Sequence, residues 1–572
     1  MNTATFSPSA SRSLTDSQWF WMIMALAALF ILAGIGLRSP WPADEPRFAL
    51  VAKEMVQSGQ WLIPTRGGEF YADKPPVFMW CIAFFYALTG HIAIASLLPN
   101  ALCSLLTLGL TYRLSRRLWD ARTARIASLV LLLTPQYIIQ AKFAQIDAMV
   151  ACWIMLGVYG LVTHYFIQSS RLWYNLSWFF MGLGIITKGV GFLPVLLLIP
   201  AAVLAAGGKT ATRFTRRDLA GPLFMLVAIV IWVGPMLWYT GQSAALLEYR
   251  NNILFHQTAD RYADSWHHIK PWYYYLVSVI PLFWLPGIAL LIAYPRRLWR
   301  LLKASPVAAT LLIWALLVVV FFSISPGKRS LYLLPAVPAI AMVSAYLFTR
   351  LPSHRRFAQM TTGIIALLST ALLSIGISAL MQAPFIMRKV SDYAVDASAL
   401  KLLAFTLCGL GTGLAGSLCI RRSLWLRLLC AEAILVLGTG LLVFPQMQSV
   451  RTPFNVLEQM QARVPLNNQV AILFWKGQYL LYAERPLYHA GFNTPADISE
   501  GAIWQWAGQQ PDRWVLVPAT VTLQCFDTTQ AISVGTAHRE DWLLLPPDAV
   551  RATCPFNTQA PVYRSAAQRQ TN

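Results

Sequence analysis

Two acidic residues and an arginine lie directly after the first long apolar run of the chain: Asp44, Glu45 and Arg47. A carboxylate beside a hydrocarbon layer is costly, so its usual uses are in water, on a metal ion or against a cation. Such a group can accept a proton as a general base. Arg47 follows Asp44 by three residues and would meet it on one helix face, and a plain ion pair is the alternative to a role in the chemistry. Alternatively, Asp44 caps a helix that Pro46 begins.

Further polar residues occur at later edges of apolar runs. Tyr71, Asp73 and Lys74 close the same loop, Asp147 opens a later apolar run, and Lys188 separates two others. A lysine in that position either pairs with a carboxylate or extends towards lipid headgroups. Asp147 either contributes to the same site or caps its helix. These residues predict a reaction centre if they share one membrane face.

The composition indicates a polytopic membrane protein. Hydrophobic residues make up 57% of the 572 residues, charged residues only 12%, and the mean hydropathy is +0.53. A soluble protein carries roughly twice that charged fraction. The first apolar run, 19–37, is long enough to span a bilayer, and no small-residue cleavage site follows it, so we expect an anchor.

The net charge of +21 does not indicate a nucleic-acid-binding protein, because the cations form short clusters between apolar runs. This is the pattern of cytoplasmic loops. The clusters occupy residues 113–125, 209–217, 296–303, 350–356 and 421–427. Each pair of clusters must then be separated by an even number of membrane crossings.

At about 20 residues a span, this parity predicts about thirteen helices with a cytoplasmic start and an external end. The expected spans are 19–37, 93–112, 126–140, 148–167, 173–187, 190–207, 219–238, 272–293, 307–323, 330–348, 361–381, 399–418 and 428–445. The short apolar stretch 77–89 is expected as an interfacial helix on the outer leaflet. The expected domains are a membrane domain, 1–445, with a large external loop, 38–92, and a soluble domain, 446–572.

The soluble domain is expected to be a small α/β module. Its candidate strands are Gln469–Phe474, Tyr479–Ala483 and Arg513–Pro518, with a helix over Ile498–Gln509. Cys525 and Cys554 are its two cysteines. An oxidising compartment would allow them to pair, and two unpaired thiols are the alternative.

The order of these motifs resembles a known family. An acidic pair followed by arginine, a Tyr-x-acid-Lys-Pro later in the same loop, an aspartate opening the fourth span and Thr187-Lys188-Gly189 are similar to polyprenyl-phosphate-dependent membrane glycosyltransferases of the GT-C type. The bacterial aminoarabinose (lipid A) transferases and the protein O-mannosyltransferase-related group resemble it most. The motifs cover about residues 1–350. The resemblance implies a mainly α, GT-C-like membrane protein.

The resemblance also implies roles for individual residues. Asp44 would be the base, and Asp147 would correspond to the family's second important aspartate. Transfer from a lipid phosphate needs cations at the leaving phosphate. Lys74 and Arg261 would bind that phosphate, while an anionic-lipid rim is the alternative for Arg261.

Other positions match the donor cavity. Tyr71 and Tyr332 resemble tyrosines near the lipid-linked sugar, although an aromatic belt would look similar. Glu45 is a further candidate for substrate binding. Asp73 and His256 match a divalent metal pair, but a relative has glutamate where this chain has Asp73, and a lone histidine is usually an ordinary loop residue.

The expected function is inverting transfer of a sugar from undecaprenyl phosphate to an envelope acceptor, most simply lipid A, at the periplasmic face of the bacterial inner membrane. A protein O-mannosyltransferase-like activity differs only in its acceptor. A transporter or lipid flippase is the alternative from another class. Transporters place ionisable groups near the middle of the membrane, whereas the polar groups here gather at one face.

Overall fold

The computed structural model describes residues 14–255, 268–393, 396–556 and 558–565. Within these ranges, eight helices are long and apolar enough to cross a membrane, or up to ten if two bent pairs each count as one span. The eight cover Ile92–Leu118, Ile146–Ile167, Arg216–Thr240, Pro306–Ile324, Ser330–Phe348, Arg355–Leu380, Ala397–Ser417 and Leu424–Gln446. The chain is a multi-pass membrane protein, as its composition predicts.

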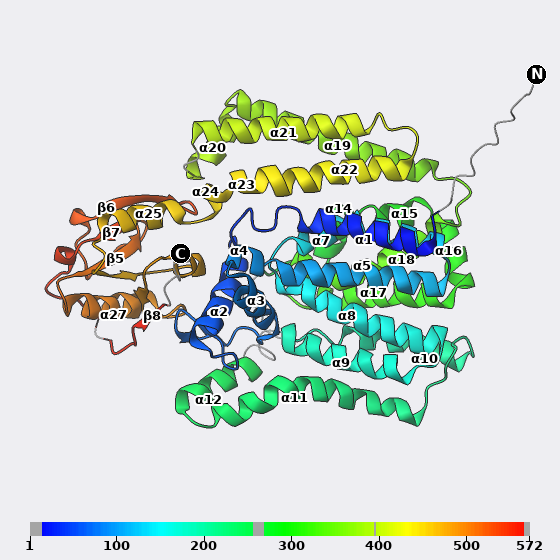
Figure 1. The fold of residues 1–572 in the computed structure, drawn as a ribbon, viewed down its shortest axis with the longest axis horizontal. Helices are drawn as coiled ribbons and strands as arrows, with labels where there is room; N and C mark the ends of the chain where they lie inside the picture. The colour runs from blue at the N-terminus through cyan, green and yellow to red at the C-terminus, as the bar shows by residue number, and fades with distance from the viewer. Residues whose placement is uncertain (1–13, 256–267, 394–395, 557, 566–572) are drawn as a thin grey trace, which may run out of the picture.

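Every expected span coincides with a helical segment, but the count of thirteen is not confirmed. The remaining expected spans fall on shorter elements: α1 (Asp16–Leu32), α9 (Arg171–Lys188) and α10 (Leu198–Ala206). Figure 1 shows α1 beside α5 (Leu98–Leu118) and α9 beside α8 (Ile146–Val162). These shorter helices therefore lie in the same bundle as the long ones.

Two expected spans are broken helices. The first consists of α6 (Ala121–Leu132) and α7 (Pro135–Ala141), which meet at 67°. The second runs from Tyr275 to Ala293 and bends by 108° between α14 (Ile280–Phe283) and α15 (Gly287–Ala293). Pro135 begins α7 and Pro286 directly precedes α15. Proline lacks the N–H of a continuous helix, so both breaks have a local cause.

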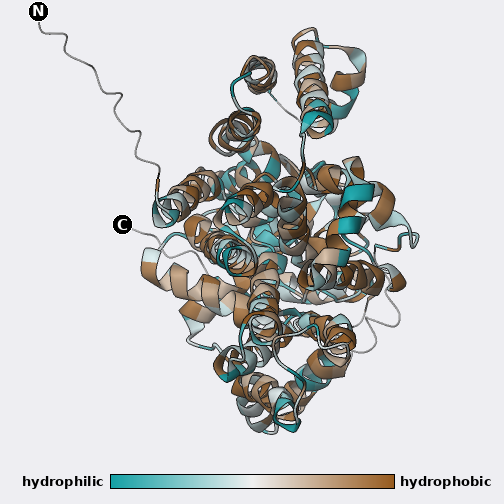
Figure 2. Ribbon diagram, turned by 90° about the vertical axis from the view of Figure 1, so that its right-hand side faces the viewer, coloured by the Kyte–Doolittle hydropathy of each residue, from teal (hydrophilic) through white to brown (hydrophobic). Residues whose placement is uncertain are grey.

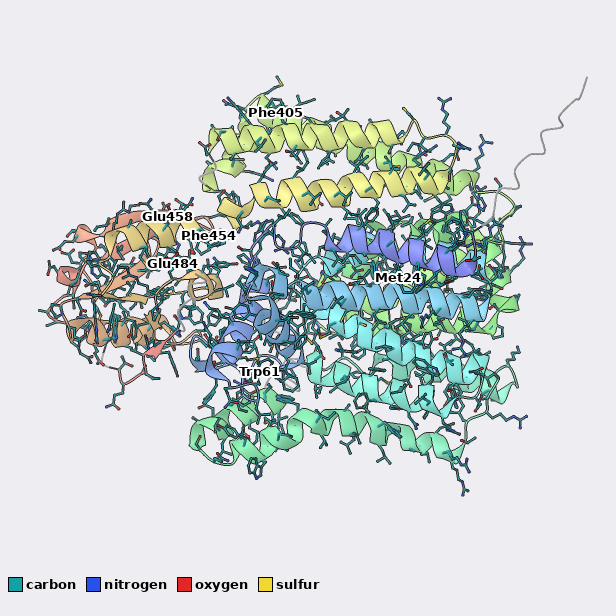
Figure 3. All side chains as sticks on the ribbon, viewed as in Figure 1. Met24, Trp61, Phe405, Phe454, Glu458 and Glu484 are labelled. Carbon is teal, nitrogen blue, oxygen red and sulfur yellow. A yellow bond between two sulfur atoms is a disulfide. The ribbon has the colours of Figure 1, made fainter. Side chains whose placement is uncertain are left out.

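The helices form layers that run across Figure 1. In that view, α19 (Arg355–Leu380), α21 (Ala397–Ser417) and α22 (Leu424–Gly438) form the upper layer, and α11 (Gly221–Thr240) lies at the lower edge. Figure 2 looks along the helices and shows hydrophobic residues on most of them. Outward-facing apolar side chains include Phe405 on α21 (Figure 3). Such surfaces suit lipid contact.

Other helices of the bundle and its edges complete this part of the chain. They are α12 (Ala244–Asn251), α16 (Pro295–Ala304), α17 (Pro306–Ile324), α18 (Val337–Phe348), α20 (Pro384–Val390), α23 (Phe444–Gln446) and α24 (Gln448–Arg451). Short 3-10 or π segments precede or follow several of them, including Ser330–Ala336 before α18 and Thr439–Val443 after α22. The helix α16, which contains Arg296, Arg297, Arg300 and Lys303, lies at the right-hand end of the bundle in Figure 1, where α1 begins.

The first external loop is a compact structure between the bundle and the C-terminal sheet (Figure 1). It contains α2 (Glu45–Ser58), a two-stranded hairpin of β1 (Thr65–Arg66) and β2 (Glu69–Phe70), then α3 (Val77–Thr89) and α4 (Ile92–Ala95). The 13-residue α3 is helical over the stretch expected to be interfacial. At 1.5 Å a residue it is too short to cross the bilayer core.

The C-terminal region is a six-stranded mixed sheet in the order β6-β7-β5-β3-β4-β8. Its strands are β3 (Gln469–Ile472), β4 (Leu487–His489), β5 (Arg513–Pro518), β6 (Ile532–Ala537), β7 (Glu540–Leu545) and β8 (Tyr563–Arg564). Only the β3–β4 and β3–β5 pairs are parallel. The helices are α25 (Phe454–Arg463), α26 (Gly477–Tyr482) and α27 (Ala496–Gly508).

The predicted strand over Tyr479–Ala483 is wrong, because this segment belongs to α26 and its end. Short apolar runs fit a buried helical turn as well as a strand. α26 packs against α2 of the first loop, and Ala49 and Leu50 of α2 belong to the apolar core around β3 and α26. The first loop and the sheet therefore share one core.

Cys525 and Cys554 form a disulfide, so the pairing alternative is the one observed.

Candidate active site

Asp44 stands at the N-terminus of α2, and its carboxylate accepts from two arginines. Arg47 Nη2 lies 2.9 Å from Oδ1, and Arg329 Nη2 lies 2.7 Å from Oδ2. The side chain makes no capping hydrogen bond to the helix. The capping alternative therefore does not hold, and the expected pair with Arg47 forms within one helical turn. Arg329 comes from the segment between α17 and α18, 285 residues away.

The two guanidinium groups decide the charge of Asp44. Its burial alone would raise the pKa of the carboxyl group, but the charges of Arg329 and Arg47 outweigh this effect and hold the pKa below its ordinary value. The hydrogen bond from Arg329 and the more distant charge of Lys188 act in the same direction. Asp44 is therefore ionised at neutral pH, as a group that accepts a proton must be.

A second ion pair joins the two membrane helices next to this site. Asp147 in the first turn of α8 pairs with Lys188 in the last turn of α9. The Lys188 ammonium also lies 4.5 Å from the ring centre of Tyr332, a distance suited to a cation–π contact. Lys188 thus has a carboxylate partner at the end of its helix, as expected for the functional alternative.

Asp73 and Tyr71 extend the site towards the hairpin. Arg47 Nη1 lies 3.5 Å from Asp73 Oδ2, so Arg47 bridges two aspartates. Tyr71 is buried, and its burial raises the pKa of the phenol. The Tyr71 hydroxyl has no hydrogen-bond partner among the described residues. A buried hydroxyl without a partner is a candidate for contact with a bound polar ligand.

The charges of the described cluster balance. Its carboxylates are Asp44, Asp73 and Asp147, and its cations are Arg47, Arg329 and Lys188. A phosphate in this space would add negative charge, which favours a further cation. Lys74 is half-buried next to Asp73. Arg261 lies outside the described residues, so its phosphate-binding role remains a prediction.

The predicted metal pair also remains a prediction, because His256 lies outside the described residues. No group of three or more His, Cys, Asp or Glu side chains suited to a metal occurs in the described ranges. Asp73, the other predicted ligand, instead faces the Arg47 guanidinium.

Glu45 lies in a separate environment from Asp44. It is buried, accepts from Arg38 Nη1 at 2.5 Å and Nη2 at 2.8 Å, and also accepts from the backbone N–H groups of Trp41 and Ala144 at 2.7 Å each. These four bonds occupy its oxygens. These bonds fix Glu45 to the start of α2, and its expected role in substrate binding remains a prediction.

Arg38 and Lys142 connect this start to the membrane helices. Arg38 Nη2 donates to the Lys142 carbonyl at 3.0 Å. Lys142 Nζ donates to the carbonyls of Phe30 and Ala33, at 2.8 and 2.5 Å, at the C-terminal end of α1. A cation at this helix end is favourable. The buried groups Glu45, Arg38 and Lys142 thus connect the backbone next to Asp44 to the end of α1.

Arg329 is the functional candidate that sequence reasoning missed. No helical spacing links it to Asp44, and its own neighbours, Lys328 and Tyr332, give no indication of its partner. The grouping of polar residues on one face was the available signal.

The chain is similar to several known proteins. A family model described as dolichyl-phosphate-mannose-protein mannosyltransferase matches residues 73–239. An undecaprenyl phosphate-alpha-4-amino-4-deoxy-L-arabinose arabinosyl transferase of Pseudomonas fluorescens is 28% identical over 62% of this chain and 65% of its own length. The corresponding protein of Pectobacterium carotovorum is 30% identical over 57% and 58%. The chain therefore matches less than two thirds of the length of either relative.

A crystal structure of ArnT from Cupriavidus metallidurans bound to undecaprenyl phosphate superposes with a TM-score of 0.72, covering 94% of this chain and all of that one at 22% identity. The chain has the fold of ArnT. The resemblance to polyprenyl-phosphate-dependent glycosyltransferases of the GT-C type is thereby confirmed. In the ArnT fold described here, the small sheet follows the last membrane helix, in agreement with the expected fold class.

Proposed function

We propose that this protein is a membrane glycosyltransferase that moves a sugar from undecaprenyl phosphate to a lipid acceptor of the lipid A type. The names of the relatives support the donor and the sugar-transfer class. The observation that carries the proposal is the ionised Asp44 between Arg47 and Arg329, close to the Asp147–Lys188 pair. This combination supplies both a base and cations at one place.

The proposed step is a single displacement at the anomeric carbon. The acceptor hydroxyl oxygen forms a bond to that carbon while the bond to the carrier phosphate oxygen breaks, so the configuration inverts. The acceptor proton passes to the Asp44 carboxylate, and the electron pair of the broken bond leaves with undecaprenyl phosphate. Cations near the leaving phosphate stabilise the charge that develops there.

Arg47 and Arg329 would link donor binding to the strength of the base. In the described arrangement both guanidinium groups neutralise Asp44 and lower its pKa. If the donor phosphate draws one of them away, the carboxylate loses part of that stabilisation and becomes a stronger base. Proton transfer is more effective as the pKa of the base approaches the working pH. The base would therefore be strengthened only when the donor is in place.

The proposed orientation puts this site at the periplasmic face of a bacterial inner membrane. The basic clusters between the spans support a cytoplasmic location for the opposite ends of the helices. The Cys525–Cys554 disulfide of the C-terminal region supports an oxidising compartment on the site's side. Residues 1–445 would form the transferase domain, and 446–572 the periplasmic domain.

A second candidate function is protein O-glycosylation, supported by the match to the mannosyltransferase model over 73–239. It uses the same donor chemistry with a hydroxyl of a protein as acceptor. The transporter alternative gains no support from the described site, where the ion pairs gather around the first external loop. Product analysis separates the two acceptors.

The test is Asp44→Asn in purified, reconstituted protein supplied with the lipid-linked donor and either lipid A or an acceptor peptide. We expect at least about a 100-fold loss of product by mass spectrometry, because the amide cannot accept the proton. Asp396→Asn is the matched control, since this exposed aspartate caps α21 and asparagine caps equally well. Wild-type turnover by Asp44→Asn would overturn the proposed base.

A further inference from the structure

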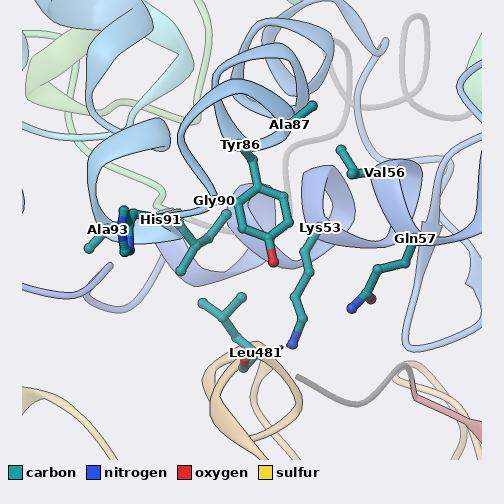
Figure 4. A pocket seen from close by; sticks show the side chains of 10 residues that line it. Lys53, Val56, Gln57, Tyr86, Ala87, Gly90, His91, Ala93 and Leu481 are labelled. Carbon is teal, nitrogen blue, oxygen red and sulfur yellow. Dashed lines mark hydrogen bonds between the residues drawn. The ribbon is translucent and has the colours of Figure 1, made fainter. Parts of the chain in front are cut away.

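A cavity of about 370 Å³ lies between the first external loop and the C-terminal sheet, apart from the candidate active site. Three residues of α2 and the end of α3 form most of its wall, and α26 closes it (Figure 4). The lining residues used below are Lys53, Val56, Tyr86, Ala87 and Leu481. None of them has a part in the proposed transfer.

Lys53 is an unusual wall residue because it is 2% exposed. Its ammonium group donates to the Leu481 carbonyl at 3.1 Å. No carboxylate lies within ion-pair distance of it in the described parts of the chain. A buried charge without an opposite charge is strongly unfavourable. Burial accordingly lowers the pKa of Lys53 to about 8, although the charge of Glu54 opposes this.

Two other buried lysines each have at least two carbonyl groups as hydrogen-bond acceptors. Lys142 Nζ reaches the carbonyls of Phe30 and Ala33, and Lys328 Nζ reaches those of Lys270 and Ser325. Lys53 has one such carbonyl and faces a cavity instead. Of these three, only Lys53 combines an incomplete set of protein acceptors with space for a ligand.

Beside the polar side chains of Gln57 and His91, much of the cavity wall is apolar and continues onto α3. Val56 and Ala87 line it, and Figure 4 shows Lys53 and Tyr86 extending into the same space. On the same α3, Phe84 and Leu88 are 58% and 71% exposed. Exposed apolar side chains on a short helix beside a membrane bundle suit acyl chains. A ligand here would have an anionic head beside Lys53 and an apolar part along α3.

We propose that this cavity binds the phosphate headgroup of an anionic membrane lipid, with Lys53 as its cation. Two lipids share this chemistry: the phosphatidylglycerol of the bilayer and a phosphate-bearing acceptor lipid. The site goes beyond the proposed transfer and does not depend on it. Because α2 carries both Lys53 and Asp44, an occupied cavity would also stabilise the packing of α2 against α26.

The experiment measures retained lipid by native mass spectrometry. The protein is reconstituted in nanodiscs of phosphatidylcholine and phosphatidylglycerol, and the lipid that it retains after release from them is identified. We expect Lys53→Gln to bind phosphatidylglycerol about fivefold more weakly or worse, as removing one cation from a lipid surface does. Lys389→Gln, an exposed lysine on α20, is the matched control and should bind like the wild type.

A second variant protects the test against misfolding. Ala87→Trp fills the cavity and leaves Lys53 in place, so it should also lose the retained lipid. Wild-type retention by both variants overturns the proposal. Complete displacement of the lipid by inorganic phosphate alone overturns the lipid assignment, because the apolar part would then contribute nothing.

A final arm distinguishes the two lipids. If the acceptor is the ligand, it displaces phosphatidylglycerol, and Lys53→Gln raises the KM for the acceptor without changing kcat. If the bilayer lipid is the ligand, the acceptor does not displace it and its KM is unchanged. Lipid retention is measured without catalysis, so its result stands even if Asp44→Asn shows that the proposed function is wrong.

Discussion

The chemistry of the candidate site depends on one carboxylate that two arginines share. Asp44 receives Arg47 from its own helix and Arg329 from a distant segment, and these charges overcome the effect of burial on its pKa. Glu45, the next residue, is buried against Arg38 and serves the scaffold. Adjacent acids thus have opposite roles, because consecutive helical residues point in different directions.

Arg329→Gln should move the acid limb of the pH profile of kcat/KM to higher pH. Without this cation, burial raises the pKa of Asp44 with less opposition, so the carboxylate is protonated at higher pH and activity is lost earlier on acidification. The profile of turnover against pH measures the shift. Arg388→Gln on exposed α20 is the control. A profile that superposes on that of the wild type would contradict the coupling.

For single residues, the sequence predicted which side chains belong to the site better than it predicted which of them contact one another. Asp44–Arg47 follows from helical spacing, whereas a carboxylate partner was expected for Lys188 without being identified as Asp147. Arg329 could not be assigned, because its distance to Asp44 depends on how α17 and α18 pack against the loop. The bond of Glu45 to Arg38 was not predicted, because nothing in the spacing of the two residues pairs an arginine directly after the first apolar run with this acid.

Elements were predicted well where a single pattern persisted over many residues. The long apolar runs became helices, and β5 matches the predicted strand Arg513–Pro518. Breaks at Pro135 and Pro286 and the helix α26 were not predicted, since tertiary packing decides whether a short apolar segment continues, bends or pairs. The hairpin β1–β2 was also unmarked, although it forms a contact between domains.

That contact predicts a pH-dependent stability. His489 of β4 is buried, donates from Nε2 to the Gly67 carbonyl at 2.8 Å and accepts at Nδ1 from the Gly491 N–H at 3.1 Å. The neutral ring satisfies both bonds. Burial lowers the pKa of His489 to about 4, the nearby Arg66 charge acts in the same direction, and the Gly67 hydrogen bond only partly opposes them.

The unfolded chain binds a proton near pH 6.5, before the folded one does. Stability is therefore complete above that pH and falls as the pH drops towards about 4, by up to about 3 kcal/mol. Thermal unfolding of wild type and His489→Gln across this range tests the sign. The variant should be less stable at neutral pH and lose less on acidification, whereas His91→Gln, at an exposed histidine, should keep the wild-type slope.

The molecule as a whole has two chemically different ends. One end carries the basic segments between helices, and the other carries the first loop and the disulfide-linked sheet (Figure 1). Charge parity predicted this polarity without any knowledge of packing. The number of spans was predicted less well. The helices α1, α9 and α10 lie in the bundle beside their neighbours, but each is too short or too polar to be identified as a membrane span by itself.

Cys419 provides a test of this polarity. It is exposed, follows α21 and stands two residues before Arg421, at the end expected in the cytoplasm. A membrane-impermeant maleimide should label it in spheroplasts only after the membrane is opened. Cys419→Ser identifies the labelled thiol. Labelling of Cys419 in sealed spheroplasts would reverse the proposed orientation.

The start and the end of the membrane domain meet at one point. A Cβ on Gly34 would lie 2.4 Å from the Gly440 carbonyl oxygen. The ring centres of Trp41 and Phe444 are 5.2 Å apart. The Ser39 N–H donates to Gln448 Oε1 at 3.1 Å. All three contacts adjoin the segment that leads to Asp44. During synthesis, some 400 residues separate the emergence of that segment from its last supporting surface. The nascent chain therefore lacks these contacts beside the Asp44 segment until residues 440–448 have been synthesised.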